Sequence, residues 1–487
     1  MKSAYKKVLS DKEKVVLIPF FKDYANVPAA YQQWLKDRSK AGILGGKRDE
    51  HLSLYLNAAG QPCKILFYCF GAEEEIKAKQ IRSSLALAIK SLRQQPLPEL
   101  ALVLNNQFLK YSQEIGEALA LSNYNTALFK TGQDRKEAEE KVIKKITIVS
   151  RDIDKVQKYN LEEGLKIGFA VNEIRDLINS PHNLVNEITF AKKAEEVCAK
   201  NKIRLKIFER RDLEKMKMGA LLAVNGGSKH GAKLIVMEYL PLGRRQDPVV
   251  LVGKGVTFDT GGVNIKPTAG LAEMHMDMAG AAAVLGVFML LRELEIQQNV
   301  IGIIPLTDNA LDAGSQKPSD VITSYCGKTI EVGNTDAEGR LILADGISYA
   351  LKNYKVSAII DIATLTGACI VALGDQMAGL FGNNDQMKQR LKNAALETDE
   401  EVWEMPIHET HHKGLKGKFA DLNNVDNSGM AGACTAAAFI EEFVDKTDWI
   451  HLDIAGPAMP KKPKDIDFQG ATGFGVRLLT RFLQNIK

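Results

Sequence analysis

The stretch PVVLVG, residues 248–253, is apolar at every position up to its closing glycine. An uninterrupted apolar run of this length is typical of a strand that is buried on both faces of a sheet. Similar runs occur in the same half of the chain at 233–239, 299–305, 356–362 and 448–455. Helical patterns occur between and after them at 278–293, 338–352, 386–398, 432–445 and 475–486. This alternation predicts an α/β fold with helices on both faces of a sheet.

The first 150 residues show a second, separate alternation of strand-like and helical segments. KVVLIPFF (14–21) has β-type composition, and residues 73–93 have helical periodicity. A long helix is expected over 160–179, where it ends before Pro181. We therefore expect two domains, an N-terminal α/β domain over 1–155 and a larger α/β domain over 156–487 that begins with this linker helix.

Composition narrows the class of protein. The 64 basic and 60 acidic side chains leave a net charge of only +4, so no electrostatic footprint for nucleic acid is visible. The six cysteines are far apart and include no C-x-x-C pair, which favours free thiols in a reducing compartment. The longest apolar run, 278–291, is too short to span a bilayer, and no signal-peptide cleavage site follows the N-terminus. A cytoplasmic protein without a membrane partner is expected.

The stretch PIHETHH, residues 406–412, contains the H-E-x-x-H pattern of a helical zinc site. Pro406 and Gly414 leave room for only a short helix, and no further cluster of ligands follows before FADLNN. We interpret this stretch as a surface connection that binds no metal.

Three glycine-containing segments lie at or just after predicted strands, at 252–280, 330–341 and 361–367. The first does not fit a nucleotide-binding loop, because proline stands at the first glycine position and glycine follows the lysine. It does contain Lys254, Asp259, Lys266 and Asp277. The two aspartates have apolar neighbours, and a buried carboxylate must pair or bind a metal.

The second segment, IEVGNTDAEGRL, contains two acids and an arginine in alternate positions. If it is extended, Asp336, Glu338 and Arg340 share one face. A helix would instead turn Glu338 about 200° away from Asp336. Taken alone, the three residues fit a structural ion network as well as a functional site. The third segment supplies hydroxyls and small residues.

Together, the loops at one sheet edge provide four carboxylates, Asp259, Asp277, Asp336 and Glu338. An oxygen-rich set of this kind suits two divalent ions about 3.5–4 Å apart. Neighbouring dications lower the pKa of a lysine enough for its amine to bind metal, and a second, charged lysine polarises a carbonyl. The chemistry indicated is metal-assisted hydrolysis.

Four stretches carry a specific resemblance: VGKGVTFDTGG, NTDAEGRL, ATLTGA and HLDIAGPA. In their order, over roughly residues 165–487, they resemble the leucyl aminopeptidase family of dinuclear metallopeptidases. The resemblance implies a smaller N-terminal α/β domain and a larger catalytic α/β domain with a central mixed sheet flanked by helices. It also implies the release of N-terminal amino acids from peptides, with the free amine of the substrate bound to a metal.

The resemblance assigns a role to each charged residue. Asp259 and Glu338 match the bridging metal ligands, Asp336 completes the more exchangeable metal site, and Lys254 and Asp277 complete the tighter one. Lys266 matches the lysine that polarises the scissile carbonyl, and Arg340 the arginine that holds a bicarbonate ion as general base for a bridging water. Positions around the pocket for the first side chain match Met274, Asn334, Thr364, Leu365 and Gly367. A methionine and a leucine there favour apolar residues such as Leu or Met.

The implied cofactors are two divalent ions per subunit, Zn²⁺ or Mn²⁺, with bicarbonate. The implied assembly is a homohexamer of two trimers. Four positions depart from the family pattern, which bears on selectivity: Thr260, Asn264, His275 and Ala279.

Two rival functions share some of these features. A phosphoesterase would use the same metal set, and some members of the family also bind DNA. DNA binding needs a basic groove, whereas residues 1–155 mix basic with acidic side chains. Nucleic acid is therefore not expected as a partner.

Overall fold

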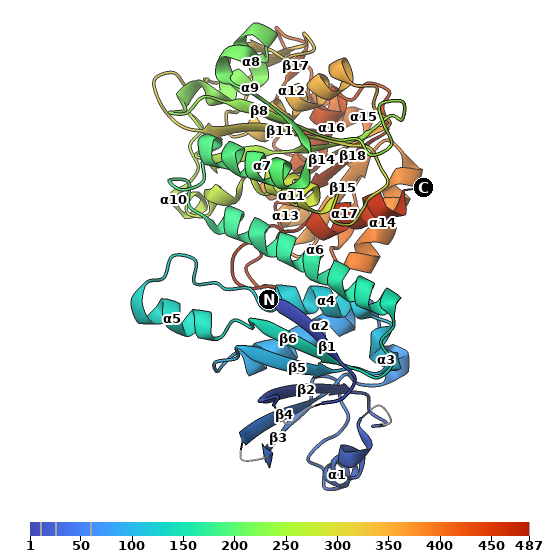
Figure 1. Ribbon diagram of the computed structural model, residues 1–487. Helices are drawn as coiled ribbons and strands as arrows, with labels where there is room; N and C mark the ends of the chain where they lie inside the picture. Colours follow the sequence, from blue (N-terminus) through green and yellow to red (C-terminus); the bar gives the residue numbers. More distant parts are fainter. Residues whose placement is uncertain (10–11, 25–26, 59–60, 487) are drawn as a thin grey trace. The chain divides into compact units, whose positions relative to one another are not determined.

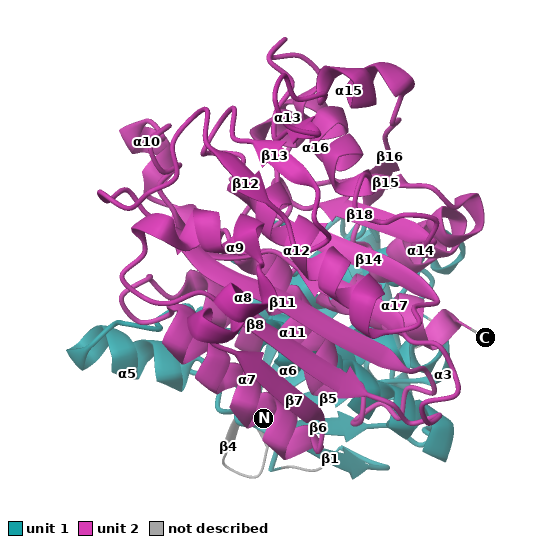
Figure 2. Cartoon of the chain, turned by 90° about the horizontal axis from the view of Figure 1, so that it is seen from above, with its two compact units in different colours: residues 1–172, 462–469 teal, residues 173–461, 470–487 magenta. Residues whose placement is uncertain are grey.

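The structure is a computed structural model that describes residues 1–9, 12–24, 27–58 and 61–486. The chain forms two compact units (Figure 2). Unit 1 comprises residues 1–172 and 462–469, and unit 2 comprises residues 173–461 and 470–487. Helix α6, Lys155–Asn179, begins earlier than the helix expected over 160–179, and the division between the units falls inside it.

Unit 1 contains a six-stranded sheet in the order β1-β6-β5-β2-β4-β3 (Figure 1). All pairs are parallel except β3 with β4, which is antiparallel. Its strands are β1 Lys2–Lys6, β2 Val15–Phe20, β3 His51–Ala58, β4 Gln61–Cys69, β5 Glu99–Val103 and β6 Lys145–Val149. Its helices are α1 Ala29–Lys40, η1 Glu73–Glu75, α2 Ala78–Leu92, α3 Asn106–Leu109, α4 Ser112–Leu121 and α5 Gly132–Glu140.

Unit 2 is built on the sheet that the apolar runs predict. The main path of this sheet is β16-β15-β18-β14-β9-β11-β8-β7, and β10 pairs with β11 beside it. Strands β8 and β15 run antiparallel to their neighbours β11 and β18, so the sheet is mixed. The strands are β7 Arg204–Phe208, β8 Lys233–Tyr239, β9 Val249–Gly253, β10 Gly255–Asp259, β11 Val300–Asn309, β14 Ala358–Ala363, β15 Ala378–Gly382, β16 Val402–Glu404 and β18 Trp449–Asp453. The expected α/β class with a mixed sheet is confirmed.

Helices cover both faces of this sheet. Helix α11, Ala279–Leu290, is buried along its whole length because it packs on β9 and β14 and also contacts α7, Glu187–Asn201, and α17, Val476–Asn485. Helix α12, Glu338–Asn353, packs on β9 and β11 together with α9, Gly219–Val224, and α16, Gly432–Glu441. The other elements are α8 Arg210–Met216, η2 Asn225–Gly227, α10 Thr268–Leu271, η3 Met274–Met276, α13 Gly367–Leu373, α14 Asp385–Thr398 and α15 Glu409–Gly414.

The segments that carry the candidate chemistry leave the sheet at one edge. Strands β9, β14 and β18 are mutually parallel, so their carboxyl ends meet there, where α/β sheets bind ligands. A small sheet of β12 Val321–Thr323, β13 Thr329–Glu331 and β17 Leu422–Asn423 anchors the segment that follows β13.

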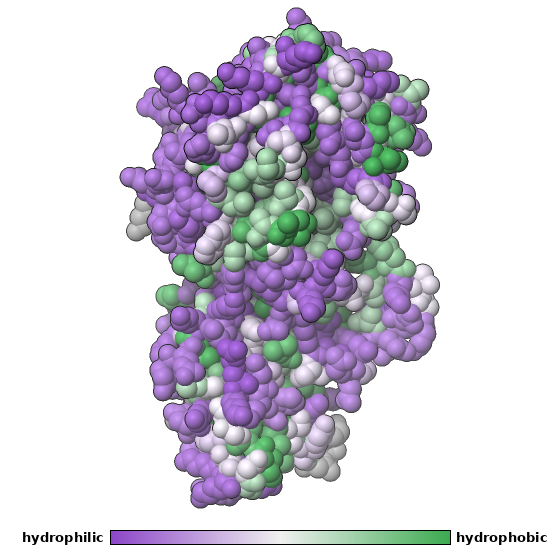
Figure 3. Space-filling model, turned by 180° about the vertical axis from the view of Figure 1, so that it is seen from behind, coloured by the Kyte–Doolittle hydropathy of each residue, from purple (hydrophilic) through white to green (hydrophobic). Residues whose placement is uncertain are grey.

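The surface carries mostly polar side chains on the face seen in Figure 3, with apolar groups scattered between them. Among the described residues, no helix is long and apolar enough to cross a membrane. The cysteines are free thiols, and Cys69, Cys198, Cys369 and Cys434 are buried, as expected.

Candidate metal centre and active site

Lys254 is the single residue between β9 and β10, and its buried side chain points into a group of acids. Its Nζ atom lies 2.8 Å from Asp277 Oδ1 and 2.9 Å from Glu338 Oε1. The same amine donates to the carbonyl oxygen of Thr364 at 2.8 Å, and the Thr364 hydroxyl donates to Asp277 Oδ1 at 2.7 Å. The ends of β9 and β14 and the start of α11 are thus joined through one lysine.

A tight turn after β10 brings a second lysine back to the acids. Gly261 and Gly262 have φ values of +86° and +64°, in the left-handed region that glycine adopts without strain. Lys266 Nζ then lies 2.8 Å from Asp259 Oδ2 and also pairs with Asp336 Oδ1. Asp259 Oδ1 accepts from the Gly261 backbone N–H at 2.8 Å, which fixes the carboxylate at the strand end.

The segment after β13 delivers the other acids by a route different from the one expected. The extended interpretation of residues 336–340 is wrong, because α12 begins at Glu338 and contains Arg340. Asp336 lies in the preceding turn, where its backbone N–H donates to Asn334 Oδ1 at 2.8 Å. The turn, rather than strand alternation, places Asp336 and Glu338 together, and the helix predicted from residue 338 is confirmed.

Burial and mutual repulsion make this group of acids unfavourable without cations. Burial and the neighbouring Asp259 carboxylate together raise the pKa of Asp336 to about 6. Burial also raises the pKa of Asp277. Burial by itself would lower the pKa of Lys254, but the carboxylates of Asp277 and Glu338 outweigh it and raise that pKa. Lys254 is therefore a charged partner of the acids in the metal-free chain.

The donor set fits divalent cations. Carboxylate oxygens of Asp259, Asp336 and Glu338 lie within 4.8 Å of one another. Among the described residues, buried Asp277 Oδ2 and Glu338 Oε2 have no hydrogen-bond partner. A buried carboxylate oxygen without a donor is costly, and a hard divalent ion satisfies it. No other group of His, Cys, Asp and Glu in the described chain meets the same proximity test.

Arg340 is buried beside this group. Its Nη1 donates to the carbonyl oxygen of Asn424 at 2.8 Å, whereas its buried Nε has no hydrogen-bond partner among the described residues. Burial lowers the pKa of Arg340 to about 10, so the guanidinium stays charged at neutral pH. One N–H of a charged group is thus left for an anion.

Of the five positions expected around a substrate pocket, only some form hydrogen bonds with the acids of the candidate metal centre. Thr364 contacts Asp277 directly, Asn334 contacts Asp336, and the Met274 carbonyl oxygen accepts from the Asp277 backbone N–H at 3.4 Å. Leu365 is half-buried and follows Thr364 on the same loop. No described hydrogen bond joins Gly367 to the charged group, and a Cβ atom built there meets only open space.

Sequence reasoning missed three residues that hold the site in place: Asn309, Asn424 and Asp453. Asn309 donates to Asp259 Oδ1 at 2.8 Å, and buried Asn424 accepts from the backbone N–H groups of Gly333 and Asn334. The signal for Asn309 and Asp453 was a polar residue at the carboxyl end of a buried strand, which is the criterion that singled out Asp259.

Asp453, at the end of β18, organises the loop after β14. Its Oδ1 accepts from the backbone N–H groups of Leu365, at 3.1 Å, and Thr366, at 3.4 Å. Its Oδ2 accepts from the Thr366 hydroxyl at 2.7 Å. Asp453 is completely buried, so these hydrogen bonds fix the loop rigidly against the sheet.

Gly339 is required by the approach of Lys254. A Cβ atom at position 339 would lie 2.7 Å from Cε and 2.8 Å from Nζ of Lys254. The lysine side chain therefore passes directly over the backbone of the first turn of α12. Thr260 and Asn264, two of the positions that depart from the family pattern, bond to backbone beside the turn, Thr260 to Asn309 and Asn264 to Thr335.

The H-E-x-x-H stretch forms no such centre. Helix α15 is six residues long, with His408 as its N-cap. The two ring nitrogens of His412 lie 3.0 Å from Glu442 and Glu441 respectively. His412 is thus held by contacts to two surface carboxylates, in agreement with the interpretation of a surface connection.

Comparison with known proteins identifies the family. The model of the cytosol aminopeptidase family catalytic domain matches residues 172–480, and the model of its N-terminal domain matches residues 17–133. A probable cytosol aminopeptidase of Chlorobium phaeobacteroides is 43% identical over 380 residues, 77% of this chain and 75% of the relative. One from Methylobacillus flagellatus is 37% identical over 470 residues, 95% of this chain and 94% of the relative.

A solved structure agrees with the sequence comparisons. The bottromycin maturation enzyme BotP in complex with Mn superposes with a TM-score of 0.85 at 27% identity, covering 97% of this chain and 99% of that one. Both domain models match in order along this chain, and the catalytic one spans more than half of it. The chain therefore belongs to the cytosol aminopeptidase family, which makes it a metal-dependent aminopeptidase.

Proposed function

We propose that this aminopeptidase holds two divalent ions, Zn²⁺ or Mn²⁺, at the edge of the unit 2 sheet. The observation that carries this proposal is the convergence of five potential ligands, with unsatisfied buried oxygens among them. On the family resemblance, Asp259 and Glu338 are assigned as shared ligands, Asp336 as a ligand of one ion, and Lys254 with Asp277 as ligands of the other. When bound, such ions supply Lewis-acid chemistry, polarising a carbonyl oxygen and lowering the pKa of a water molecule.

Two cationic side chains take roles beside this centre. Lys266 is partly exposed and reaches Asp259 and Asp336, so its ammonium is placed to donate to the carbonyl oxygen of a substrate. Such a donor stabilises the charge that develops on that oxygen in the transition state. Arg340 offers its Nε–H to a bicarbonate ion, which would accept a proton from the attacking water. Lys266 and Arg340 are thus assigned to the reaction, and neither is assigned as a metal ligand.

The preference proposed is for peptides that begin with an apolar residue such as Leu or Met. Met274 and Leu365 supply apolar surface beside the acids, and Asn334, Thr364 and Gly367 complete the proposed pocket. A pocket of this kind discriminates by about 1–3 kcal/mol per methylene, so the preference should be graded. His275, next to Met274, is proposed to cover the pocket rim.

The cellular setting is proposed from the family resemblance. We assign the protein to the cytoplasm, because its relatives are named cytosol aminopeptidases. A homohexamer is proposed on the same resemblance, and sedimentation or light scattering of the purified chain measures it directly. The expected domain limits, 1–155 and 156–487, also stand as a proposal.

The decisive experiment measures metal content and turnover in the same protein samples. The purified chain loaded with Mn²⁺ or Zn²⁺ should release nitroaniline from leucyl-p-nitroanilide and leave p-nitrophenyl phosphate intact. Asp336→Ala and Glu338→Ala should lose bound metal, measured by mass spectrometry, and activity together. Normal turnover with two ions still bound to either variant would refute the site, and activity on the phosphate ester alone would establish the phosphoesterase alternative.

A further inference from the structure

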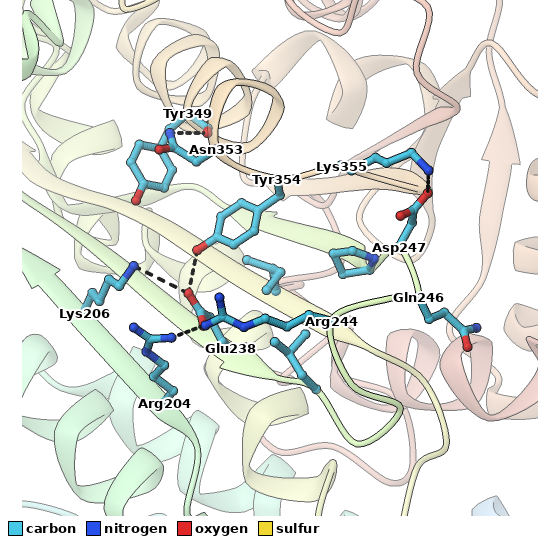
Figure 4. A pocket seen from close by; sticks show the side chains of 13 residues that line it. Arg204, Lys206, Glu238, Arg244, Gln246, Asp247, Tyr349, Asn353, Tyr354 and Lys355 are labelled. Carbon is cyan, nitrogen blue, oxygen red and sulfur yellow. Dashed lines mark hydrogen bonds and ion pairs between the residues drawn. The ribbon is translucent and has the colours of Figure 1, made fainter.

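A second pocket lies at the opposite edge of the unit 2 sheet. It has a volume of about 320 Å³ and is shown in Figure 4. Pro248 and Lys355 line it just before β9 and β14 begin, and Ile301 lines it at the start of β11. Helix α12 runs from Glu338 in the candidate metal centre to Asn353 in this pocket, roughly 22 Å at 1.5 Å per residue. The pocket is therefore separate from the metal centre.

The lining carries more positive than negative charge. Four cationic side chains line it against two carboxylates: Arg204, Lys206, Arg244 and Lys355 against Glu238 and Asp247. The carboxylates are already engaged within the chain. Glu238 lies 3.4 Å from Arg204 and 3.7 Å from Lys206, and Asp247 lies 3.0 Å from Lys355.

Arg244 is the cation that remains without a partner. Its guanidinium makes no hydrogen bond or ion pair with any other described residue, although it lines the pocket. Figure 4 shows its side chain extended from the loop before β9 toward Glu238 and Tyr354. Because Glu238 already accepts from the Tyr354 hydroxyl at 2.9 Å and pairs with Arg204, the forked N–H groups of Arg244 are available to a ligand.

Tyr349 adds a hydroxyl donor to this cation. Its side chain is 4% exposed, and its hydroxyl has no hydrogen-bond partner within the described chain. In the view of Figure 4, the Tyr349 hydroxyl points toward the end of the Lys206 side chain. Burial raises the pKa of Tyr349 to about 12, so the phenol keeps its proton at neutral pH. The hydroxyl of a buried tyrosine normally finds a hydrogen-bond partner.

The remaining wall is apolar. Leu240, Pro248 and Ile301 line the pocket, and the rings of Tyr349 and Tyr354 pack against each other with centroids 6.5 Å apart. A ligand that fits both walls needs a charged end and an apolar body.

We propose that this pocket binds a small organic anion, whose oxyanion head is held by Arg244 and Tyr349 and whose apolar body lies against Leu240 and Pro248. Carboxylate and phosphate heads share this chemistry, because a guanidinium binds either through paired N–H groups. Lys206 contributes a further positive charge at the head.

The test is calorimetric titration of the metal-loaded protein with benzoate, phenyl phosphate and, as the neutral control, benzyl alcohol. Benzoate or phenyl phosphate should bind once per chain, and the one that binds identifies the head group. Arg244→Gln should raise the Kd at least about 10-fold, and Tyr349→Phe about 3- to 10-fold, since each removes donors from the head. Arg245→Gln, a matched change on the same loop outside the lining, should leave the Kd unchanged.

Three results would overturn the proposal. The first is no binding of either anion, and the second is equal binding of benzyl alcohol. The third is a Kd that both Arg244→Gln and Tyr349→Phe leave at the wild-type value. The titration is repeated with Asp336→Ala, which alters only the candidate metal centre. Retained binding there supports the proposal, and loss of binding would place the anion at the metal centre instead.

Discussion

Lys254 Nζ lies 2.8 Å from Asp277 Oδ1, and both side chains are almost completely buried. The acids of the candidate metal centre therefore have internal cations when no metal is bound. Chelation should abolish activity while leaving the chain folded, as measured by far-UV circular dichroism. Loss of the cooperative unfolding transition on chelation would contradict this expectation.

Lys254→Met should destabilise the chelated protein strongly. Without the ammonium, Asp277 and Glu338 remain buried without their cation, which costs about 3–5 kcal/mol of the free energy of unfolding. Urea unfolding in the presence of chelator measures this loss. Lys266→Met is the matched control and should cost less, because Lys266 is more exposed than Lys254. Equal stability of Lys254→Met and wild type would show that the pairing is not significant.

Lys266→Ala should lower kcat by about 10²–10³-fold with metal content unchanged, the typical cost of removing a donor to a developing oxyanion. Arg340→Ala should lower kcat less, by about 10- to 100-fold, because water or another base partly replaces the positioned one. The two variants are compared by measuring turnover of leucyl-p-nitroanilide together with metal content. Identical losses for both variants would argue against distinct roles.

Asp453→Asn should act on substrate binding more than on chemistry. The change removes one of the oxygens that hold the loop of Leu365 and Thr366, at a cost of about 1 kcal/mol. KM for a leucyl substrate should therefore rise roughly 5-fold, with kcat and metal content nearly constant. Thr366→Val removes the hydroxyl that donates to Asp453 and accepts from the Cys369 backbone N–H, and it should shift KM in the same direction. A fall in kcat at constant KM would place Asp453 in the chemical step instead.

Asp345 gives the stability a pH dependence that can be isolated. This buried residue of α12 accepts from the backbone N–H groups of Leu221 and Tyr325, yet burial raises its pKa to about 7. Between its unfolded pKa near 3.8 and about 7, the folded chain holds a proton that the unfolded chain has released. Its contribution to stability therefore falls as pH rises through this window, by at most about 1.4 kcal/mol per unit.

Asp345→Asn removes this titration, although its amide nitrogen cannot accept from a backbone N–H as the second carboxyl oxygen does. The variant should therefore be less stable than wild type near pH 4, and the difference should narrow as the pH approaches 8, in urea unfolding of chelated protein. A difference between the two proteins that does not change with pH would contradict the assignment.

Much of the catalytic unit was predictable because its strands are uniformly apolar. β8 matches the predicted run 233–239 residue for residue, and β9 and β14 lie within one or two residues of theirs. Asp259 and Asp277 were identifiable because each interrupts an apolar environment. Their meeting at one edge follows from parallel strands, which the alternation with helices already indicates.

The rest could not be predicted, because it depends on contacts that a local pattern does not encode. If extended, Asp336, Glu338 and Arg340 would share one face, but α12 begins at Glu338. A run of three alternate polar residues is too short to distinguish a strand from a turn that leads into a helix. The place of residues 462–469 in unit 1 was likewise not predictable, because Phe468 packs on Tyr124 and under Lys90, contacts that no local pattern encodes.

The contact between Gly339 and Lys254 limits how this enzyme can be engineered. Since any side chain at 339 would collide with the lysine, the first turn of α12 and the β9–β10 junction act as one packing unit. A chimera that takes one of these segments from a relative and keeps the other from this chain must preserve both partners of the contact. Grafting experiments should therefore exchange the two segments as a pair.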